Sequence, residues 1–139
     1  MKATNFHLSL PCVSLESTKR FYTENLNCKL GRNSTNWCDI NLFGNQLTFI
    51  HDERFKFPVS HYNFRGSVLP SFHFGVLLEE SAWLNLRSKC REQNIVSVST
   101  ISFLQNEVGE HSSFFVEDPN SYLVEFKCFR KSEEIFSTK

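Results

Sequence analysis

Two similar stretches of sequence decide the fold of this chain: Phe6-His7-Leu8-Ser9-Leu10 and Phe72-His73-Phe74-Gly75-Val76. Each is a short apolar run with a histidine at its second position, and a helical pattern follows each of them. Because side chains alternate along a β-strand, each imidazole is expected on the face opposite its apolar neighbours. The repeat predicts two related modules, each beginning with a histidine-bearing strand.

The first module is predicted over about residues 4–51. Ser14 is suited to cap its helix, and Pro11 is expected to end its first strand because proline donates no ladder hydrogen bond. Gly44-Asn45 is expected to form the turn of a hairpin. The predicted elements are a strand over 5–11, a helix over about 15–26, and strands over 37–43 and 46–51.

The second module is predicted over about residues 71–130 in the same order. Its last two strands flank the turn Asp118-Pro119-Asn120-Ser121, in which we expect Asn120 to take the left-handed conformation. Residues from Glu133 on are polar and expected to fray. The predicted elements are a strand over 71–78, a helix from about 79 to 94, and strands near 95–104, 111–117 and 122–129.

Residues 52–70 show no sustained periodicity and contain Pro58, Gly66 and Pro70. They are predicted to connect the modules as a long loop or a lid. The fold class is therefore α+β, with the pattern βαβββ occurring twice. Because two copies of this size are too small to be stable alone, we expect a single domain over residues 1–139 with one shared core.

Composition excludes several classes of function. The formal net charge is zero, which argues against a nucleic-acid partner or a polybasic membrane anchor. No apolar run approaches the roughly 20 residues that span a bilayer. The five cysteines are odd in number and form no CxxC pair, so we expect reduced thiols and a cytoplasmic location.

Three residues are candidate metal ligands. His7 and His73 occupy corresponding places in the two first strands, and Glu125 lies on the last strand opposite Val124 and Phe126. Two imidazoles and one carboxylate on one concave face are the ligands of the 2-His-1-carboxylate facial triad. The alternative is that each histidine is a hydrogen-bonded structural residue and Glu125 belongs to a solvated face.

Three passages carry a family resemblance: FHLSLPCVSLESTKRFYTENL at 6–26, FHFGVLL at 72–78, and FFVEDPNSYLVEFK at 114–127. In this order they resemble the vicinal oxygen chelate superfamily, which includes glyoxalase I, bleomycin-resistance proteins, fosfomycin-resistance thiol transferases and extradiol dioxygenases. The resemblance spans almost the whole chain. It implies paired βαβββ modules that form a half-open barrel around a divalent metal ion.

The resemblance also assigns the ligands residue by residue. His7 and His73 match the ligands on the first strands of the two modules, and Glu125 matches the ligand on the last strand. GNQLTF places Gln46 where a carboxylate is commonest, as a fourth ligand or a substrate contact. Because an amide cannot act as a base, Gln46 argues against ordinary glyoxalase chemistry.

The function implied is that of a divalent-metal-dependent enzyme acting on a small oxygen-chelating substrate by lyase, isomerase or dioxygenase chemistry. The metal would be Fe, Zn, Ni or Mn, and Glu125 would also shuttle a proton. Dioxygenase chemistry would need an acid–base histidine and a tyrosine close to the metal ligands, for which His111 and Tyr122 are the candidates. A transferase would use Arg32 or Lys127 for an anionic substrate. The alternative is a non-catalytic, bleomycin-resistance-type binding protein, and the resemblance implies a homodimer in either case.

Overall fold

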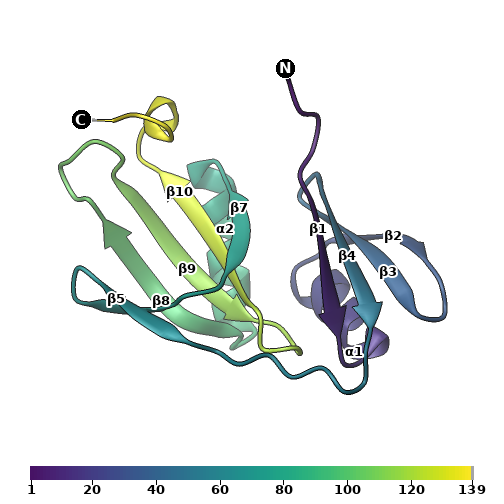
Figure 1. Ribbon diagram of the computed structural model, residues 1–139. Coiled ribbons are helices and arrows are strands. Elements are labelled where there is room, and N and C mark those ends of the chain that lie inside the picture. Colours follow the sequence, from purple (N-terminus) through teal and green to yellow (C-terminus); the bar gives the residue numbers. More distant parts are fainter. Residues whose placement is uncertain (139) are drawn as a thin grey trace. The chain divides into compact units, whose positions relative to one another are not determined.

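The chain folds into two compact units, and the computed structural model describes residues 1–138 (Figure 1). The first unit comprises Met1–Pro58 together with the short segment Asp118–Ser121, and is called the first module below. The second unit comprises Val59–Glu117 and residues 122–138, and is called the second module.

The first module is a four-stranded sheet with one helical segment, in the strand order β1-β4-β3-β2. Strands β1 and β4 pair in parallel, and the other pairs are antiparallel. The helix α1 continues directly into a π-helical turn, η1. The elements are β1 (His7–Cys12), α1 (Leu15–Arg20), η1 (Phe21–Asn25), β2 (Lys29–Asn33), β3 (Trp37–Leu42) and β4 (Asn45–His51).

Alternation along the strands gives this sheet one apolar and one polar face. The apolar face and the helical segment contribute the buried side chains of the module, and the Tyr22 ring lies 5.1 Å from the ring of Phe49. As predicted, Ser14 caps α1 by accepting a hydrogen bond from the Ser17 amide. The opposite face carries His7 and the polar residues of β3 and β4.

Two local predictions for the first module are wrong. Pro11 lies inside β1 and pairs with Ile50; it is tolerated because β1 is an edge strand and its missing N–H interrupts no central ladder. The hairpin turn is Phe43-Gly44, one residue earlier than expected, with φ values of 48° and 95°. Positive φ at both central residues is what the twist of a two-residue hairpin requires.

The second module has a four-stranded sheet in the order β7-β10-β9-β8 and a separate two-stranded sheet, β5-β6. Here too the first and last strands, β7 and β10, pair in parallel. The elements are β5 (His61–Phe64), β6 (Ser67–Pro70), β7 (Phe74–Leu77), α2 (Glu80–Glu92), β8 (Val96–Phe103), β9 (His111–Glu117), β10 (Leu123–Phe129) and the 3-10 turn η2 (Ser132–Glu134).

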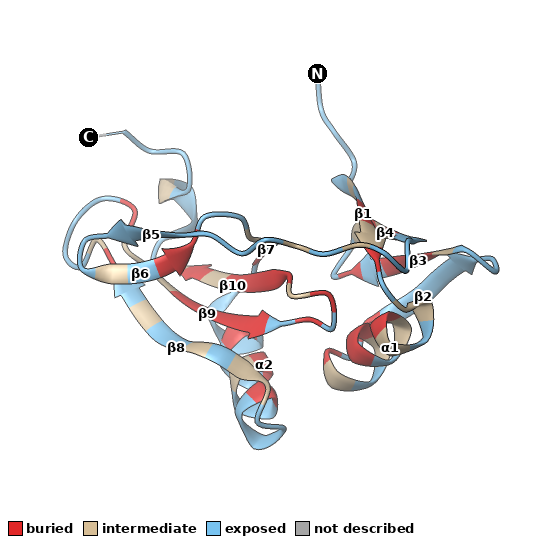
Figure 2. Cartoon of the chain, turned by 60° about the horizontal axis from the view of Figure 1, so that its bottom comes forward, coloured by how far each residue is buried: buried red, intermediate tan, exposed pale blue. Residues whose placement is uncertain are grey.

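The core of the second module is centred on β9 and β10, which are buried over most of their length (Figure 2). Helix α2 contacts this sheet through Trp83, whose ring lies 5.5 Å from Phe114 and whose indole N–H donates to the Phe126 carbonyl at 2.8 Å. A second cluster contains residues of the hairpin and the sheet: Leu69, Phe103, Phe115 and Leu123.

The predicted pair of βαβββ modules is confirmed, because both four-stranded sheets have the same strand order and the same parallel pair. Within residues 1–138 the strands form three separate sheets, none of which closes into a barrel. The half-open barrel and the single shared core concern the placement of the modules and stay predictions. The 52–70 connection is more regular than expected, since it contains the β5–β6 hairpin.

The Asp118–Ser121 turn belongs to the first module by its contacts. Asp118 accepts a hydrogen bond from the Tyr22 hydroxyl at 3.0 Å, and the Asn120 side chain accepts one from the Val13 amide at 2.9 Å. The left-handed residue of the turn is Ser121, with φ of 67°, and not Asn120. The Asn120 side chain also donates hydrogen bonds to Thr18 and Asp118.

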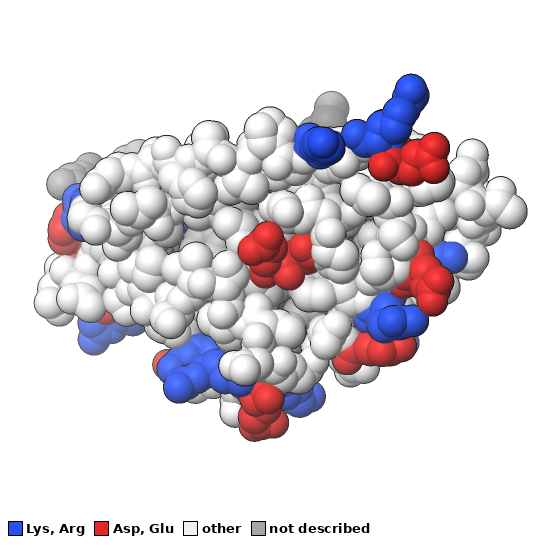
Figure 3. Space-filling view, turned by 90° about the horizontal axis from the view of Figure 1, so that it is seen from below, with Lys and Arg blue, Asp and Glu red and all other residues white. Residues whose placement is uncertain are grey.

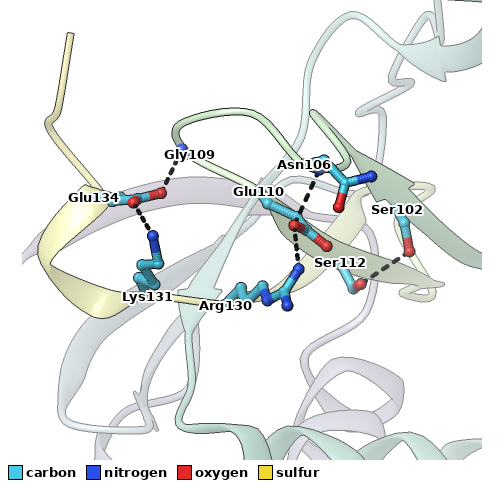
Figure 4. Close-up of polar contacts among 8 residues, drawn as sticks. All are labelled: Ser102, Asn106, Gly109, Glu110, Ser112, Arg130, Lys131 and Glu134. Carbon is cyan, nitrogen blue, oxygen red and sulfur yellow. Dashed lines mark hydrogen bonds and ion pairs between the residues drawn. The ribbon is translucent and has the colours of Figure 1, made fainter. Parts of the chain in front are cut away.

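The C-terminal segment is held more firmly than its polarity suggests (Figure 4). Glu134 accepts hydrogen bonds from the Gly109 amide at 2.8 Å and from Lys131 at 2.9 Å. Arg130 forms an ion pair with Glu110 at 2.8 Å. The expectation that fraying begins at Glu133 is therefore wrong, because η2 satisfies its polar groups against the loop before β9.

Charged side chains are scattered over the surface in mixed signs. On the face seen in Figure 3, basic groups lie next to acidic ones, with wide uncharged areas between them. This distribution agrees with the net charge of zero. Within residues 1–138, no helix combines the length and the apolarity needed to cross a membrane.

Gly75 is required for the approach of β7 to β10. A Cβ added at Gly75 would lie 1.7 Å from the Glu125 carbonyl oxygen, well inside van der Waals contact. We therefore expect Gly75→Ala to reduce the free energy of unfolding by about 3 kcal/mol, because the strand pair must separate. Urea unfolding measures this change.

The control is Gly66→Ala, where an added Cβ meets nothing within 4 Å and only the φ of 86° is strained. Its expected cost is about 1 kcal/mol. Equal costs for the two variants would show that the close approach at Gly75 is not rigid.

Candidate functional site

His73 and Glu125 lie side by side in the second module. Glu125 is in β10 opposite Gly75 of β7, and His73 immediately precedes β7. The His73 Nε2 atom is 3.2 Å from Glu125 Oε2, and the two side chains are 24% and 11% exposed. The parallel pairing that needs Gly75 thus brings together two residues that are 52 positions apart in the sequence.

The backbone fixes the orientation of the His73 ring. Nδ1 lies 2.9 Å from the Pro70 carbonyl oxygen, which can only accept a hydrogen bond, so Nδ1 carries a proton. The ring also contacts Phe115 edge-on at 5.4 Å. Nε2 is consequently the nitrogen that faces the carboxylate, either protonated or with its lone pair available to a metal ion.

The two side chains shift each other's ionisation. The hydrogen bond and charge of Glu125 raise the pKa of His73, although burial opposes this shift. Burial alone would raise the pKa of Glu125, but His73, Ser113 and Lys127 outweigh it and lower that pKa. At pH values below the raised pKa of His73 the arrangement is therefore an ion pair of imidazolium and carboxylate.

Ser113 and Lys127 complete the polar surroundings of Glu125. Lys127 Nζ is 3.7 Å from Glu125 Oε1. The Ser113 hydroxyl is fully buried and lies beside the carboxylate, where it helps to lower the pKa of Glu125.

His111 and Tyr122, the candidates for dioxygenase chemistry, both make extensive aromatic contacts. The His111 ring lies between Phe103 and Phe129, 5.0 Å from each, and burial lowers the pKa of the imidazole. Tyr122 is 1% exposed and packs its ring against Phe72 and Phe74. These aromatic contacts give both residues a role in packing.

In the first module, His7 lies on the polar face of the sheet. It pairs with Gln46 of the neighbouring strand β4, and the next residue on this face, Ser9, pairs with Thr48. Ser9 and Gly75 correspond to each other, because each comes two residues after the histidine of its module. Ser9 pairs with Thr48 and Gly75 pairs with Glu125, so Thr48 corresponds to Glu125. The pairing register therefore places Thr48, and not Gln46, at the position equivalent to the glutamate.

Asp39 is the buried carboxylate of the first module, and the sequence analysis missed it. It accepts hydrogen bonds from Thr48 Oγ1 at 2.6 Å, Arg32 Nε at 3.0 Å and Gln46 Nε2 at 3.1 Å. Burial would raise the pKa of Asp39, but these donors and the Arg32 charge lower it. The alternation of side chains along β3 could have predicted it, because it places Asp39 on the face opposite Cys38 and Ile40.

Of the predicted ligands, the structure brings together His73 and Glu125. His7 and Gln46 are neighbours in the first module, and their relation to the other two stays a prediction. Within residues 1–138, no group of three or more His, Cys, Asp or Glu side chains is arranged to hold a metal ion. All five cysteines are free and buried, as expected of reduced thiols.

Comparison with solved structures agrees with the architecture described above. A glyoxalase/bleomycin resistance protein/dioxygenase from Alicyclobacillus acidocaldarius is 27% identical, over 95% of this chain and 96% of that one, with a TM-score of 0.81. The fosfomycin resistance protein FosX from Listeria monocytogenes is 13% identical, over 96% and 98% of the two chains, with a TM-score of 0.66.

A putative glyoxalase family protein from Bacillus anthracis is also similar, with 13% identity over 94% of this chain and 98% of that one and a TM-score of 0.65. At 13% identity the last two show the fold alone. No protein-family model and no curated protein matches the sequence.

Two βαβββ modules of identical strand order define a glyoxalase-type α+β fold. The chain has the fold of the vicinal oxygen chelate superfamily, the group of glyoxalases, bleomycin-resistance proteins and dioxygenases.

The ion pair predicts how the metal-free protein responds to pH. We expect the His73 imidazole to titrate above its ordinary pKa of 6.5, and Glu125→Gln to lower that pKa by removing the charge. NMR titration of the His73 ring protons measures both values.

The sign of the stability effect follows from the same shifts. The raised pKa of His73 adds stability that is lost as pH rises through it, and the lowered pKa of Glu125 adds stability that is lost as pH falls through it. The pair therefore stabilises most between the ordinary values of 4.5 and 6.5. An unchanged His73 pKa in Glu125→Gln would contradict the ion pair.

Proposed function

We propose that this protein is a divalent-metal-dependent enzyme that acts on a small oxygen-chelating substrate by lyase, isomerase or dioxygenase chemistry. Its proposed metal ligands are His7, His73 and Glu125. The observation that carries the proposal is the convergence of His73 Nε2 and Glu125 Oε2, 3.2 Å apart, with the other imidazole nitrogen held by the Pro70 carbonyl.

This geometry suits a pair of metal ligands. Two ligand atoms that are each about 2.1 Å from a metal ion, with a right angle between the two bonds, lie about 3 Å apart. A ligating histidine usually donates its second N–H to a carbonyl or carboxylate, as His73 does to Pro70. Both residues thus have the donor atoms, the spacing and the outer hydrogen bond that a metal site needs.

His73 and Glu125 would hold a divalent cation only with Nε2 deprotonated, so the proton that Nε2 carries in the ion pair would have to leave. Metal affinity should accordingly rise as pH rises through the elevated pKa of His73. Lys127, 3.7 Å from the carboxylate, provides a further cation that the metal ion has to outcompete.

A bound Fe, Zn, Ni or Mn ion would act as a Lewis acid on adjacent substrate oxygens. The residues of the chain would hold and orient it: Pro70 fixes the imidazole, and the Ser113 hydroxyl lies beside the Glu125 carboxylate. Glu125 is also the candidate for moving a proton, because its partner His73 and its neighbour Lys127 already keep it ionised. A homodimer and a cytoplasmic location are part of the proposal on family grounds.

The first test is the metal content of protein purified without chelators or an affinity tag. We expect near-stoichiometric divalent metal, and a loss of affinity on the order of 100-fold or more in His73→Ala and Glu125→Ala, because each removes a direct ligand. His7→Ala should behave alike. His111→Ala is the matched control, a second part-buried histidine outside the proposed ligands.

The identity of the metal selects the assay that follows. Iron calls for dioxygen consumption with catechol-like substrates, whereas nickel, zinc or manganese calls for lyase and isomerase screens. No metal as purified and none taken up on reconstitution would contradict the enzyme proposal and favour the non-catalytic binding protein.

Gln46 gives a separate prediction. Because its amide nitrogen donates to Asp39 and the pairing register puts Thr48 at the place of the glutamate, we expect Gln46→Ala to leave the metal content nearly unchanged. Elemental analysis of the purified variant measures this. A large loss of metal would instead make the Gln46 carbonyl oxygen a fourth ligand.

A further inference from the structure

A second polar site lies in the first module, on the same sheet face as His7. A hollow of about 440 Å³ is lined there by His7, Arg32, Trp37, Asp39 and neighbouring residues of β4. Asp39 is only 6% exposed and accepts hydrogen bonds from three different side chains. Since burying a carboxylate is costly, this degree of saturation indicates a constructed site and not an incidental surface charge.

The backbone of β2 aims Arg32 at Asp39. The pairing of β2 with β3 is irregular between Leu30 and Asn33, and such bulges redirect side chains. Gly31 lets the strand pass closely, because a Cβ there would lie 3.2 Å from the Asp39 Cβ. The guanidinium also lies over the Trp37 ring, 5.6 Å from its centroid. Arg32 is therefore held from two sides.

The guanidinium has donors left after binding Asp39. The Nε and Nη2 atoms of Arg32 each lie 3.0 Å from Asp39 Oδ2. This contact uses two of the five N–H groups of the guanidinium. Of the remaining three, one on Nη1 and one on Nη2 are parallel along the outer edge of the group. This edge matches the two oxygens of a carboxylate or a phosphonate, and the side chain is 75% exposed.

We propose that the outer edge of Arg32 is a subsite for the oxyanion of a small substrate, and that Asp39 is its positioning residue. This rests on the proposed function only in taking the oxyanion as part of the substrate of that enzyme. Among the described residues that line the hollow, Asp39 is the one carboxylate, and its lone pairs face donors of the protein. A ligand anion that enters the hollow therefore meets the guanidinium of Arg32, which Asp39 holds in place.

The test is an NMR titration of chelator-treated protein with methylphosphonate and, separately, acetate. We expect saturable shifts of the Arg32 Nε–H and the Trp37 indole N–H. Arg32→Gln should weaken binding at least about 10-fold, and Arg32→Lys should weaken it less, because the charge remains while the paired donors are lost. Binding of both probes supports a general oxyanion subsite; binding of methylphosphonate alone restricts it to phosphonate or phosphate groups.

Asp39→Asn separates positioning from net charge. Removing a negative charge beside Arg32 should strengthen anion binding if net charge decides, whereas losing the anchor should weaken it severalfold if position decides. We expect weakening. The Arg32 variants alter an exposed side chain and so keep the test decisive even if Asp39→Asn does not fold.

The matched control is Arg20→Gln, which removes an exposed arginine of the same module paired with Glu16 at 3.0 Å and should not change the affinity. Unchanged binding in Arg32→Gln, or stronger binding in Asp39→Asn, would overturn the inference. His73→Ala should bind the probes normally, so that failure of the metal proposal and failure of the anion subsite are distinguished.

Discussion

The parallel pairing of the first and last strands of each module is the constraint on which the rest of the structure depends. In the second module, β7 approaches β10 so closely that only a glycine fits opposite Glu125. This approach sets His73, two residues before Gly75, against the Glu125 carboxylate, and the Pro70 carbonyl then decides which imidazole nitrogen faces it. The same pairing in the first module sets His7 beside Gln46.

The two modules differ in how they satisfy a buried carboxylate. Asp39 is saturated by fixed donors, among them the hydroxyl of Thr48 and the amide of Gln46, so it stays ionised without any added cation. Glu125 instead pairs with His73, whose proton is exchangeable, and has Ser113 and Lys127 beside it. This difference is why we propose metal binding for Glu125 and an orienting role for Asp39.

Much of the architecture was readable from the sequence because the strands of the first module bury one sheet face. Alternation located His7 on the polar face of that sheet, and the cap at Ser14 located the first helix. The errors concern places where tertiary context overrides a local rule. Pro11 sits in an edge strand, where its missing N–H does no harm, and Ser121 takes the left-handed conformation instead of Asn120, whose side chain accepts a hydrogen bond from the Val13 amide.

The sequence by itself determined the repeated βαβββ order and named His73 and Glu125, because the side-chain period of a strand is two and each interrupts an apolar stretch. It did not reveal Asp39 or the pairing of Thr48 with Ser9. Those depend on strand register and on a bulge in β2, which join residues distant in the chain. Only the tertiary structure sets such distances, since periodicity specifies a face of the sheet but not the partner across it.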